Sequence, residues 1–251
     1  MVRRTMIYMT PSNRNLVGDR DIFTQSLWGQ ILTPASFANA PKAAVWCGDN
    51  EIFTGKYRFW RFYRWLWRKR PHRRTCIFIN APDWLEILPD KTVRGSAWRT
   101  WLRYLCHFWL IRMLGFPVAY VAQDGSEHWP FPPFCNAVFI GGSTEWKMSP
   151  AADRVIHQAK KHGLWVHVGR VNSQSRIRHF KLVGVDSVDG TSPTYAPDRD
   201  FWRFQSVLMQ PSLFTLPAPS TRPSSADGAQ ARRRSGGAEL GLLDKGEWGE
   251  W

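Results

Sequence analysis

The sequence predicts a parallel α/β fold, and specifically a (β/α)8 barrel of the TIM type. Short apolar runs recur along the chain, helical patterns separate them, and most of the runs end in small or acidic residues. This alternation is typical of repeated βα units around a parallel sheet. Seven such runs favour a closed barrel over an open sheet.

The first three predicted strands lie within the first 80 residues. They are the apolar runs 6–9, 43–46 and 76–79. Between the second and third, residues 55–70 read as a helix rich in Trp, Tyr, Phe and Arg. We interpret this helix as an insertion into the barrel.

The remaining elements continue the alternation. Ser149-Pro150 is a typical helix opening, because Pro is favoured at the first helical position. We predict a helix over 94–114, strands over 117–121 and 137–140, a helix over 151–162, and strands over 164–168 and 183–188.

The composition separates one folded domain from a tail. Residues 1–210 are long enough for a single barrel domain with a sizeable core. From Pro211 the chain is rich in Pro, Ser, Ala, Gly and Arg and has no hydrophobic period. We therefore predict that 211–251 is a disordered basic tail.

The charge balance points to a polyanionic partner. The chain has 34 Lys and Arg against 20 Asp and Glu, a net charge of +14. Nucleic acid is the simplest such partner. An unspecific basic surface, or the basic tail alone, is the alternative.

Cysteine spacing and the aromatic runs exclude several protein classes. The four cysteines form no C-x-C or C-x-x-C pair, so we expect reduced, buried thiols and no zinc or other cofactor. The aromatic run 57–67 is interrupted by arginines, which excludes a membrane span. The N-terminus has no apolar signal region. We expect a cytoplasmic protein without a membrane partner.

Polar groups follow five of the predicted strands. They are Asp49, Asp83, Gln123, the pair Gly141-Gly142, and Asp189. In a parallel barrel these groups converge on the C-terminal face, where chemistry is placed. The alternative is that the aspartates only cap turns.

These motifs resemble the tRNA-guanine transglycosylase (queuine tRNA-ribosyltransferase) family. That family builds a (β/α) barrel and exchanges guanine for a 7-deazaguanine base in a nucleic acid. The matching segments are Trp46-Cys-Gly-Asp-Asn-Glu-Ile-Phe53, Asn80-Ala-Pro-Asp83, Val121-Ala-Gln-Asp-Gly125, Phe139-Ile-Gly-Gly-Ser-Thr-Glu145 and Gly184-Val-Asp-Ser-Val-Asp189.

The resemblance covers roughly residues 6–205 and includes two departures. The C-terminal zinc motif of the family, C-x-C-x-x-C with a distant His, is absent, and the chain is shorter than the tRNA enzymes. Both features are closer to the DNA-modifying DpdA-like branch, which occurs with DNA 7-deazaguanine systems and in phages. The resemblance thus implies DNA as substrate, in a bacterial or phage-infected cell, with tRNA as the alternative.

The resemblance assigns a role to each strand-end residue. Asp189 would be the nucleophile, with Asp186 the first alternative, and Asp49 would move protons between the two bases. Asp83, Gln123 and the backbone of Gly141 and Gly142 would read a base such as preQ0. The chemistry itself needs such residues, because exchange with retention is a double displacement through a covalent intermediate. A helper protein is left open as a further partner.

Arginines interleaved with aromatic residues form a candidate nucleic-acid surface. Arg58, Arg61, Arg64 and Arg68 suit phosphates, and the aromatic residues between them suit stacking on a base. Arg170, after a strand, is a further candidate. The alternative is an amphipathic helix whose arginines are only solvated. We interpret His167 as a core histidine with satisfied hydrogen bonds.

Three other functions remain open. The first is the same exchange on tRNA. The second is a catalytically silent barrel that binds nucleic acid and supports an active partner. The third is a glycoside or nucleoside hydrolase, which uses the same paired carboxylates but releases free base.

Overall fold

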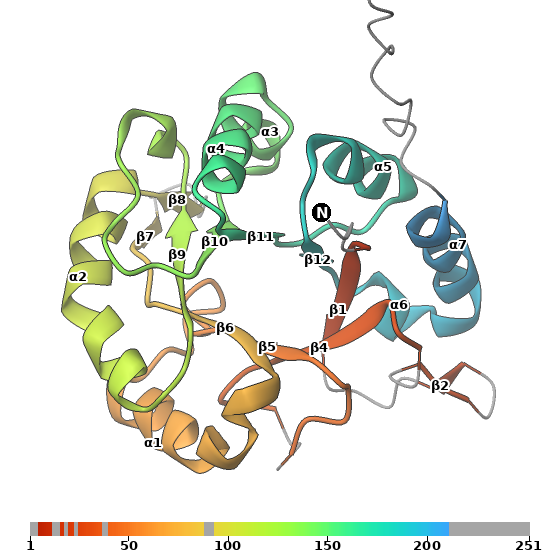
Figure 1. The fold of residues 1–251 in the computed structure, drawn as a ribbon, viewed down its shortest axis with the longest axis horizontal. Helices are drawn as coiled ribbons and strands as arrows, with labels where there is room; N and C mark the ends of the chain where they lie inside the picture. The colour runs from red at the N-terminus through yellow and green to blue at the C-terminus, as the bar shows by residue number, and fades with distance from the viewer. Residues whose placement is uncertain are drawn as a thin grey trace, which may run out of the picture. The chain divides into compact units, whose positions relative to one another are not determined.

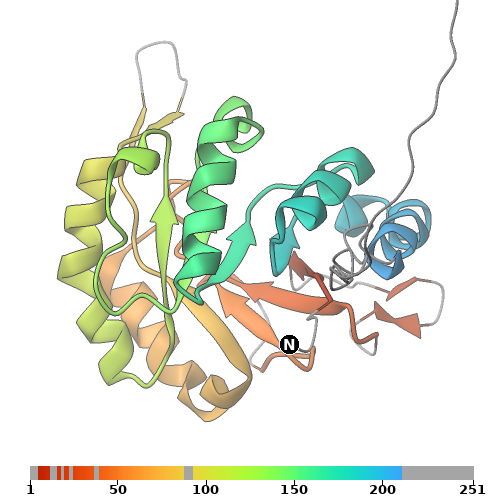
Figure 2. The ribbon, with the colours of Figure 1, turned by 45° about the horizontal axis from the view of Figure 1, so that its top comes forward.

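Eight parallel strands close into a barrel in the order β1-β12-β11-β10-β9-β6-β5-β4 (Figure 1). The computed structural model describes residues 5–11, 16–17, 20–22, 25–36, 40–87 and 93–210. Helices lie outside the ring of strands, which Figure 2 shows from a tilted view. The predicted (β/α)8 fold class is confirmed.

The barrel strands are short, and each pairs in parallel with two neighbours. They are β1 (Ile7–Pro11), β4 (Trp28–Leu32), β5 (Trp46–Gly48), β6 (Cys76–Asn80), β9 (Val118–Ala122), β10 (Ala137–Ile140), β11 (Trp165–Val168) and β12 (Ser187–Asp189). Two small antiparallel pairs stand outside the barrel. They are β2 (Leu16–Val17) with β3 (Arg20–Asp21), and β7 (Leu85–Ile87) with β8 (Val93–Gly95).

Helices follow five of the strands. They are α1 (Phe59–Lys69) after β5, α2 (Ala97–Met113) after β6, α3 (Thr144–Lys147) and α4 (Pro150–Lys161) after β10, α5 (Gln174–Val183) after β11, and α6 (Ser192–Tyr195) and α7 (Pro197–Met209) after β12. The 3-10 turns are η2 (Arg70–Thr75) and η3 (Ser126–His128). The prediction that the Arg- and Trp-rich helix is an insertion is wrong, because α1 is the regular crossover from β5 to β6.

One strand, β4, has no counterpart among the predicted strands. Its sequence, Trp-Gly-Gln-Ile-Leu, contains residues that are uncommon in strands. Gly29 packs closely against the neighbouring strand, because a Cβ there would lie 2.3 Å from the Met9 sulfur unless that side chain moved. The glycine leaves room for the Met9 side chain inside the barrel. It also interrupts the apolar pattern by which a strand is recognised in the sequence.

Two predicted strands have shifted boundaries. The expected run 43–46 begins too early, since β5 covers Trp46–Gly48. The expected run 183–188 also begins too early, because α5 extends to Val183 and ends at Gly184, whose φ is +93°. A glycine in the left-handed region is a common helix terminator, and β12 begins only at Ser187.

The core has two layers. Inside the barrel, Met9, Ile31, Cys47 and Phe78 pack with two alanines. Between strands and helices lies a larger aromatic layer, in which Trp28 stacks on Phe201 of α7. Side chains alternate between these layers because successive residues of a strand point to opposite faces.

The expected burial of the four cysteines is only partly correct. All four cysteines are free, but only Cys47 and Cys76 are buried, so the expectation of four buried thiols is wrong for the exposed Cys106 and the half-buried Cys135. The predicted tail, 211–251, lies outside the described residues. None of the helices in the described ranges has the length and apolar character needed to cross a bilayer.

Candidate active site

The C-terminal ends of five strands bring the predicted polar residues to one end of the barrel. Asp49 follows β5, Asp83 follows β6, Gln123 follows β9, Gly141 and Gly142 follow β10, and Asp189 ends β12. Asp186 does not join them. It precedes β12, accepts the backbone N–H of Val166 and pairs with Lys160 at 2.6 Å.

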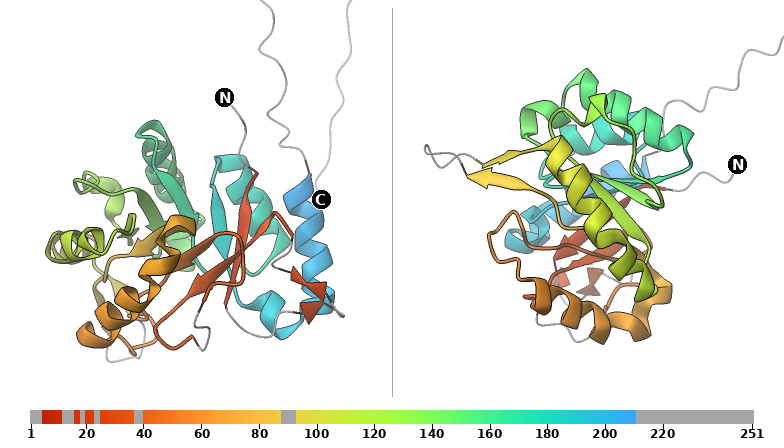
Figure 3. Two further views of the ribbon diagram at one scale, coloured as in Figure 1. Left: turned by 60° about the horizontal axis from the view of Figure 1, so that its bottom comes forward. Right: turned by 90° about the vertical axis from the view of Figure 1, so that its left-hand side faces the viewer.

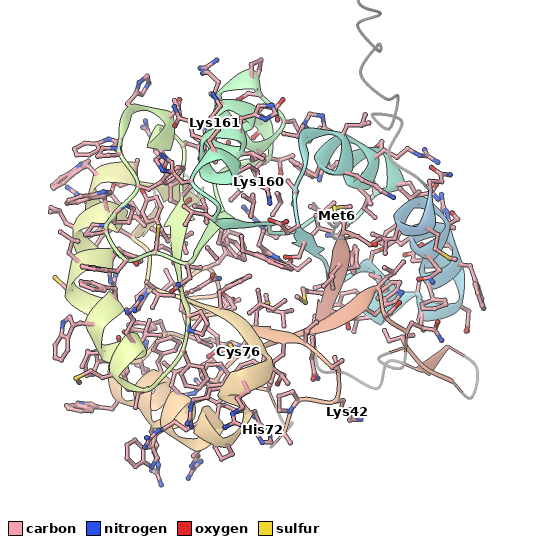
Figure 4. All side chains as sticks on the ribbon, in the orientation of Figure 1. Met6, Lys42, His72, Cys76, Lys160 and Lys161 are labelled. Atoms are coloured by element: carbon pink, nitrogen blue, oxygen red, sulfur yellow. The ribbon has the colours of Figure 1, made fainter. Side chains whose placement is uncertain are left out.

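Lys160 lies at the end of the barrel where the strands begin, together with Met6 and Cys76 (Figure 4). Asp186, the alternative nucleophile, is therefore not part of the cluster of polar residues at the C-terminal face. Asp186 and Asp189 lie at opposite ends of β12.

The Asp189 carboxylate is oriented by two donors. One oxygen, Oδ2, lies 2.9 Å from His167 Nε2, and the other, Oδ1, accepts the backbone N–H of Arg170 at 2.9 Å. Its side chain is 14% exposed, whereas His167 is fully buried. A carboxylate held on both oxygens has one defined direction in which to present its lone pairs.

A hydrogen-bonded chain inside the barrel sets the His167 tautomer. Trp165 Nε1–H donates to Ser187 Oγ, which lies 2.8 Å from His167 Nδ1. An ionised Asp189 only accepts, so Nε2 of a neutral His167 carries the proton and Nδ1 accepts from the Ser187 hydroxyl. His167 is the satisfied core histidine that the sequence predicted, but one of its partners is the candidate nucleophile.

Asp49 is the second carboxylate of the cluster. Burial raises the pKa of Asp49, and Asp189 raises it further, while the Asn80 amide and the backbone of Asn50 and Glu51 oppose the shift. Asn80 Nδ2 donates to Asp49 Oδ1 at 3.2 Å. A carboxyl group with a raised pKa suits proton transfer near neutral pH.

The other amide atom of Asn80 has no protein partner. Asn80 is 1% exposed, and its Oδ1 lacks a hydrogen-bond donor. A buried acceptor of this kind is costly unless a water or a ligand satisfies it. Asn80 is a site residue to which the sequence assigned no role.

Asp83 and Gln123 form a buried pair. Gln123 Nε2 donates to Asp83 Oδ2 at 2.7 Å, and Asn50 Nδ2 donates to Oδ1 at 3.1 Å. Burial and the nearby Asp49 raise the pKa of Asp83 to about 6. Gly95 of β8 covers Gln123 so closely that a Cβ there would lie 2.3 Å from Gln123 Oε1. The hairpin of β7 and β8, which projects from the barrel in Figure 3, thus contributes to this side of the site.

Arg170 engages the Gly-Gly loop. The backbone N–H groups of Gly141 and Gly142 donate to the Ala122 carbonyl, and their own carbonyls accept from the Arg170 guanidinium at 2.7 Å each. Arg170 also lies over the Phe53 ring at 4.3 Å and has a left-handed φ of 62°. The Arg170 guanidinium therefore bonds to other residues of the site. A base that binds the carbonyls of Gly141 and Gly142 would have to displace it.

The four arginines of the α1 region lie outside the barrel. Arg61, Arg64 and Arg68 line an open groove of about 490 Å³ together with Pro34, Trp60 and Trp65. Arg61 pairs with Glu51 at 3.0 Å, which ties the start of the groove to the loop after Asp49. Arg58 precedes the helix, and Arg68 lies about 10 Å further along the helix axis than Arg61.

Helix α1 has one face that packs on the barrel and another that is exposed to solvent. Phe62 and Trp65 pack on the barrel, whereas Trp60 is 82% exposed and Trp67 is 60% exposed. Exposed tryptophans beside arginines suit stacking on unpaired bases. Within the described part of the chain, no group of three or more His, Cys, Asp or Glu is arranged to hold a metal ion.

The fold and site define a (β/α)8 barrel with paired carboxylates at its C-terminal face. No family model and no curated protein matches the chain. Among solved structures, the chain is similar to a protein from a structural study of Aquifex aeolicus VF5, with 10% identity and a TM-score of 0.42. It is also similar to tryptophan synthase from M. tuberculosis in an open form with BRD0059 bound, with 12% identity and a TM-score of 0.39. Each comparison covers 82% of this chain and 91% of the other. Similarity at this level carries no argument about function.

Proposed function

We propose that this protein is a transglycosylase that exchanges guanine for a 7-deazaguanine base in DNA. The observation that carries the proposal is the arrangement of Asp189, which is held by His167 and the Arg170 backbone at the same barrel end as Asp49. A fixed nucleophile beside a carboxyl group of raised pKa is what a double displacement requires.

In the proposed reaction, Asp189 attacks the anomeric carbon of the deoxyribose. The bond from that carbon to guanine breaks, and Asp49 gives its proton to the departing base. The incoming base then loses a proton to Asp49 and attacks the same carbon, which releases the Asp189 carboxylate. Two inversions give net retention, as in retaining glycosidases.

Base selection is assigned to the buried amide and carboxylate groups. The ionised Asp83 offers only acceptors, which match the ring N–H and exocyclic amine of a guanine-type base. Asn80 Oδ1 is a further acceptor without a protein donor. A site that buries such groups rejects bases that leave them unpaired.

The choice of polymer rests on the sequence. The motifs of the printed sequence, which include no C-x-C-x-x-C pattern, are closer to the DNA-modifying branch and favour DNA over tRNA. The groove on α1 supports a nucleic acid in general, since it combines exposed tryptophan and arginine.

The proposal is tested by supplying labelled preQ0 with either duplex DNA or tRNA. We expect label to enter DNA and guanine to be released in equal amount. Incorporation into tRNA alone would change the substrate, and release of guanine without incorporation would indicate a hydrolase. No reaction with either polymer, with or without a cell extract to supply a helper protein, would favour the silent binding barrel.

Affinity for the free base is expected to rise as pH rises through about 6. In the free protein the raised pKa keeps Asp83 protonated below about pH 6, and the base binds the ionised form, so binding releases a proton. Calorimetric titration with preQ0 between pH 5 and 8 measures this. Asp83→Asn should bind weakly at every pH, and Asp153→Asn on α4 should behave like the wild type. An affinity that falls or stays constant over this range would contradict the assignment of Asp83.

Replacing Arg61, Arg64 and Arg68 with Ala should weaken binding about equally for all DNA sequences. The log–log salt dependence should flatten by about 0.7 to 0.9 for each phosphate that the variant no longer neutralises. Base choice should not change, because it belongs to the barrel interior. A control with the same reduction in charge replaces three exposed residues, Arg154 and Lys161 on α4 and Arg178 on α5. Equal effects of the two triple variants would mean that α1 is not the binding surface.

A further inference from the structure

A buried lysine lies beside the candidate nucleophile, and the proposed reaction does not use it. Lys147 is the last residue of α3, the one-turn helix after the Gly-Gly loop, and it is 3% exposed. Its Nζ donates to the Gly169 carbonyl at 2.6 Å. A buried ammonium group is costly, so its retention at this position calls for a role.

The carbonyl that Lys147 contacts belongs to the peptide group that binds the nucleophile. The Gly169 C=O and the Arg170 N–H are the two ends of one amide, and that N–H donates to Asp189 Oδ1. The three groups therefore form a continuous chain from the Lys147 ammonium through the amide to the Asp189 carboxylate. Hydrogen bonds in such a chain polarise one another.

The orientation of this peptide group is unusual. Arg170 adopts a φ of 62°, a region that residues other than glycine rarely occupy. Such a conformation persists where surrounding contacts determine it. Here the amide is held at its oxygen by Lys147 and at its N–H by Asp189, and a Cβ on Gly169 would clash with the Phe139 ring at 2.7 Å.

We propose that Lys147 is a positioning residue, which polarises the Gly169–Arg170 peptide and thereby stabilises the Asp189 carboxylate as it leaves the sugar. This inference rests on the proposed transglycosylase function. No proton moves along the chain. The effect is a stronger N–H donor to Asp189 while Lys147 is protonated, and a weaker one when it is neutral.

The charges around Lys147 make this coupling sensitive to pH. Burial lowers the pKa of Lys147 to about 7. Arg170 after β11 and Arg176 on α5 also lower it, while Asp189 on β12 and Asp124 after β9 raise it. Lys147 is therefore protonated below about pH 7 and neutral above it, and the support for Asp189 weakens as pH rises through that value.

The first test observes the Gly169–Arg170 peptide group directly and needs no enzymatic activity. The backbone amide of Arg170 is followed by ¹H–¹⁵N NMR from pH 5.5 to 8.5 in the wild type, Lys147→Met and Lys147→Arg. We expect a titration with a midpoint near 7 in the wild type only. Lys147→Arg keeps its charge throughout and should show no midpoint. If Lys147→Met does not fold, the wild type and Lys147→Arg decide the question. An Arg170 amide that titrates identically in the wild type and Lys147→Arg overturns the proposal.

The second test measures departure of Asp189 from the sugar. The covalent protein–DNA species is formed without acceptor base, preQ0 is added, and the rate of capture is followed. Removal of one charge-assisted hydrogen bond predicts capture about 10- to 100-fold slower in Lys147→Met. Lys147→Arg should restore most of the rate and remove its pH dependence near 7. Capture by Lys147→Met at the wild-type rate also overturns the proposal.

The two tests separate the inference from the function on which it rests. A titration of the Arg170 amide that depends on Lys147, in a protein that exchanges no base, supports the coupling and contradicts the transglycosylase assignment. Base exchange without that coupling supports the function and contradicts the role of Lys147.

Discussion

Asp189→Asn is expected to abolish base exchange, with a decrease of about 10⁴-fold or more. An amide cannot form the bond to the sugar, yet it has nearly the same shape as the carboxylate. The surroundings can accept it, because His167 can switch tautomer against Ser187 and accept from the new amide group. Binding of DNA should therefore change little. Label incorporation and DNA affinity are measured on the same preparation.

The matched control is Asp186→Asn, in the same motif but at the other end of β12. It removes the ion pair with Lys160 and weakens the contact with the Val166 backbone. We therefore expect this variant to unfold at a lower temperature than the wild type. Exchange should be retained by the folded fraction. Appreciable turnover by Asp189→Asn would place the nucleophile elsewhere. An inactive but folded Asp186→Asn variant would contradict the conclusion that Asp186 lies outside the active site.

Asp49→Asn is expected to slow exchange by about 10²- to 10⁴-fold, the usual contribution of a general acid or base. Departing guanine can take a proton from water, whereas the incoming base must lose one before it attacks. The second displacement should therefore be slowed more than the first, so that a covalent protein–DNA species accumulates. Intact-protein mass spectrometry after denaturation measures that species.

The double variant Asp49→Asn/Asp189→Asn is the control for this adduct. It should form none, because the attacking carboxylate is missing. An adduct that persists in the double variant would identify another nucleophile. If Asp49→Asn exchanges base at the wild-type rate while Asp189→Asn is inactive, proton transfer belongs to a different residue.

Much of the barrel was predictable from local patterns. The alternation of apolar runs with helical patterns identified seven of the eight barrel strands and the fold class. It failed at β4, where Gly29 weakens the strand pattern and packs against the Met9 side chain of the adjacent strand, a contact between residues distant in sequence. It also misjudged α1 as an insertion, because composition does not reveal which strands a helix connects.

By itself, the sequence determined that Asp49, Asp83, Gln123, the Gly-Gly pair and Asp189 follow strands, and parallel pairing then requires them to meet. Only the tertiary structure decided what each group touches. The backbone of β12 places Asp186 and Asp189 three residues apart at opposite ends of a short strand. The bonds of Asp189 to His167 and the Arg170 peptide, and of that peptide to Lys147, join residues 19 to 22 positions apart. Such contacts are set by how neighbouring βα units pack, because local sequence controls the conformation of a segment and not the register between segments.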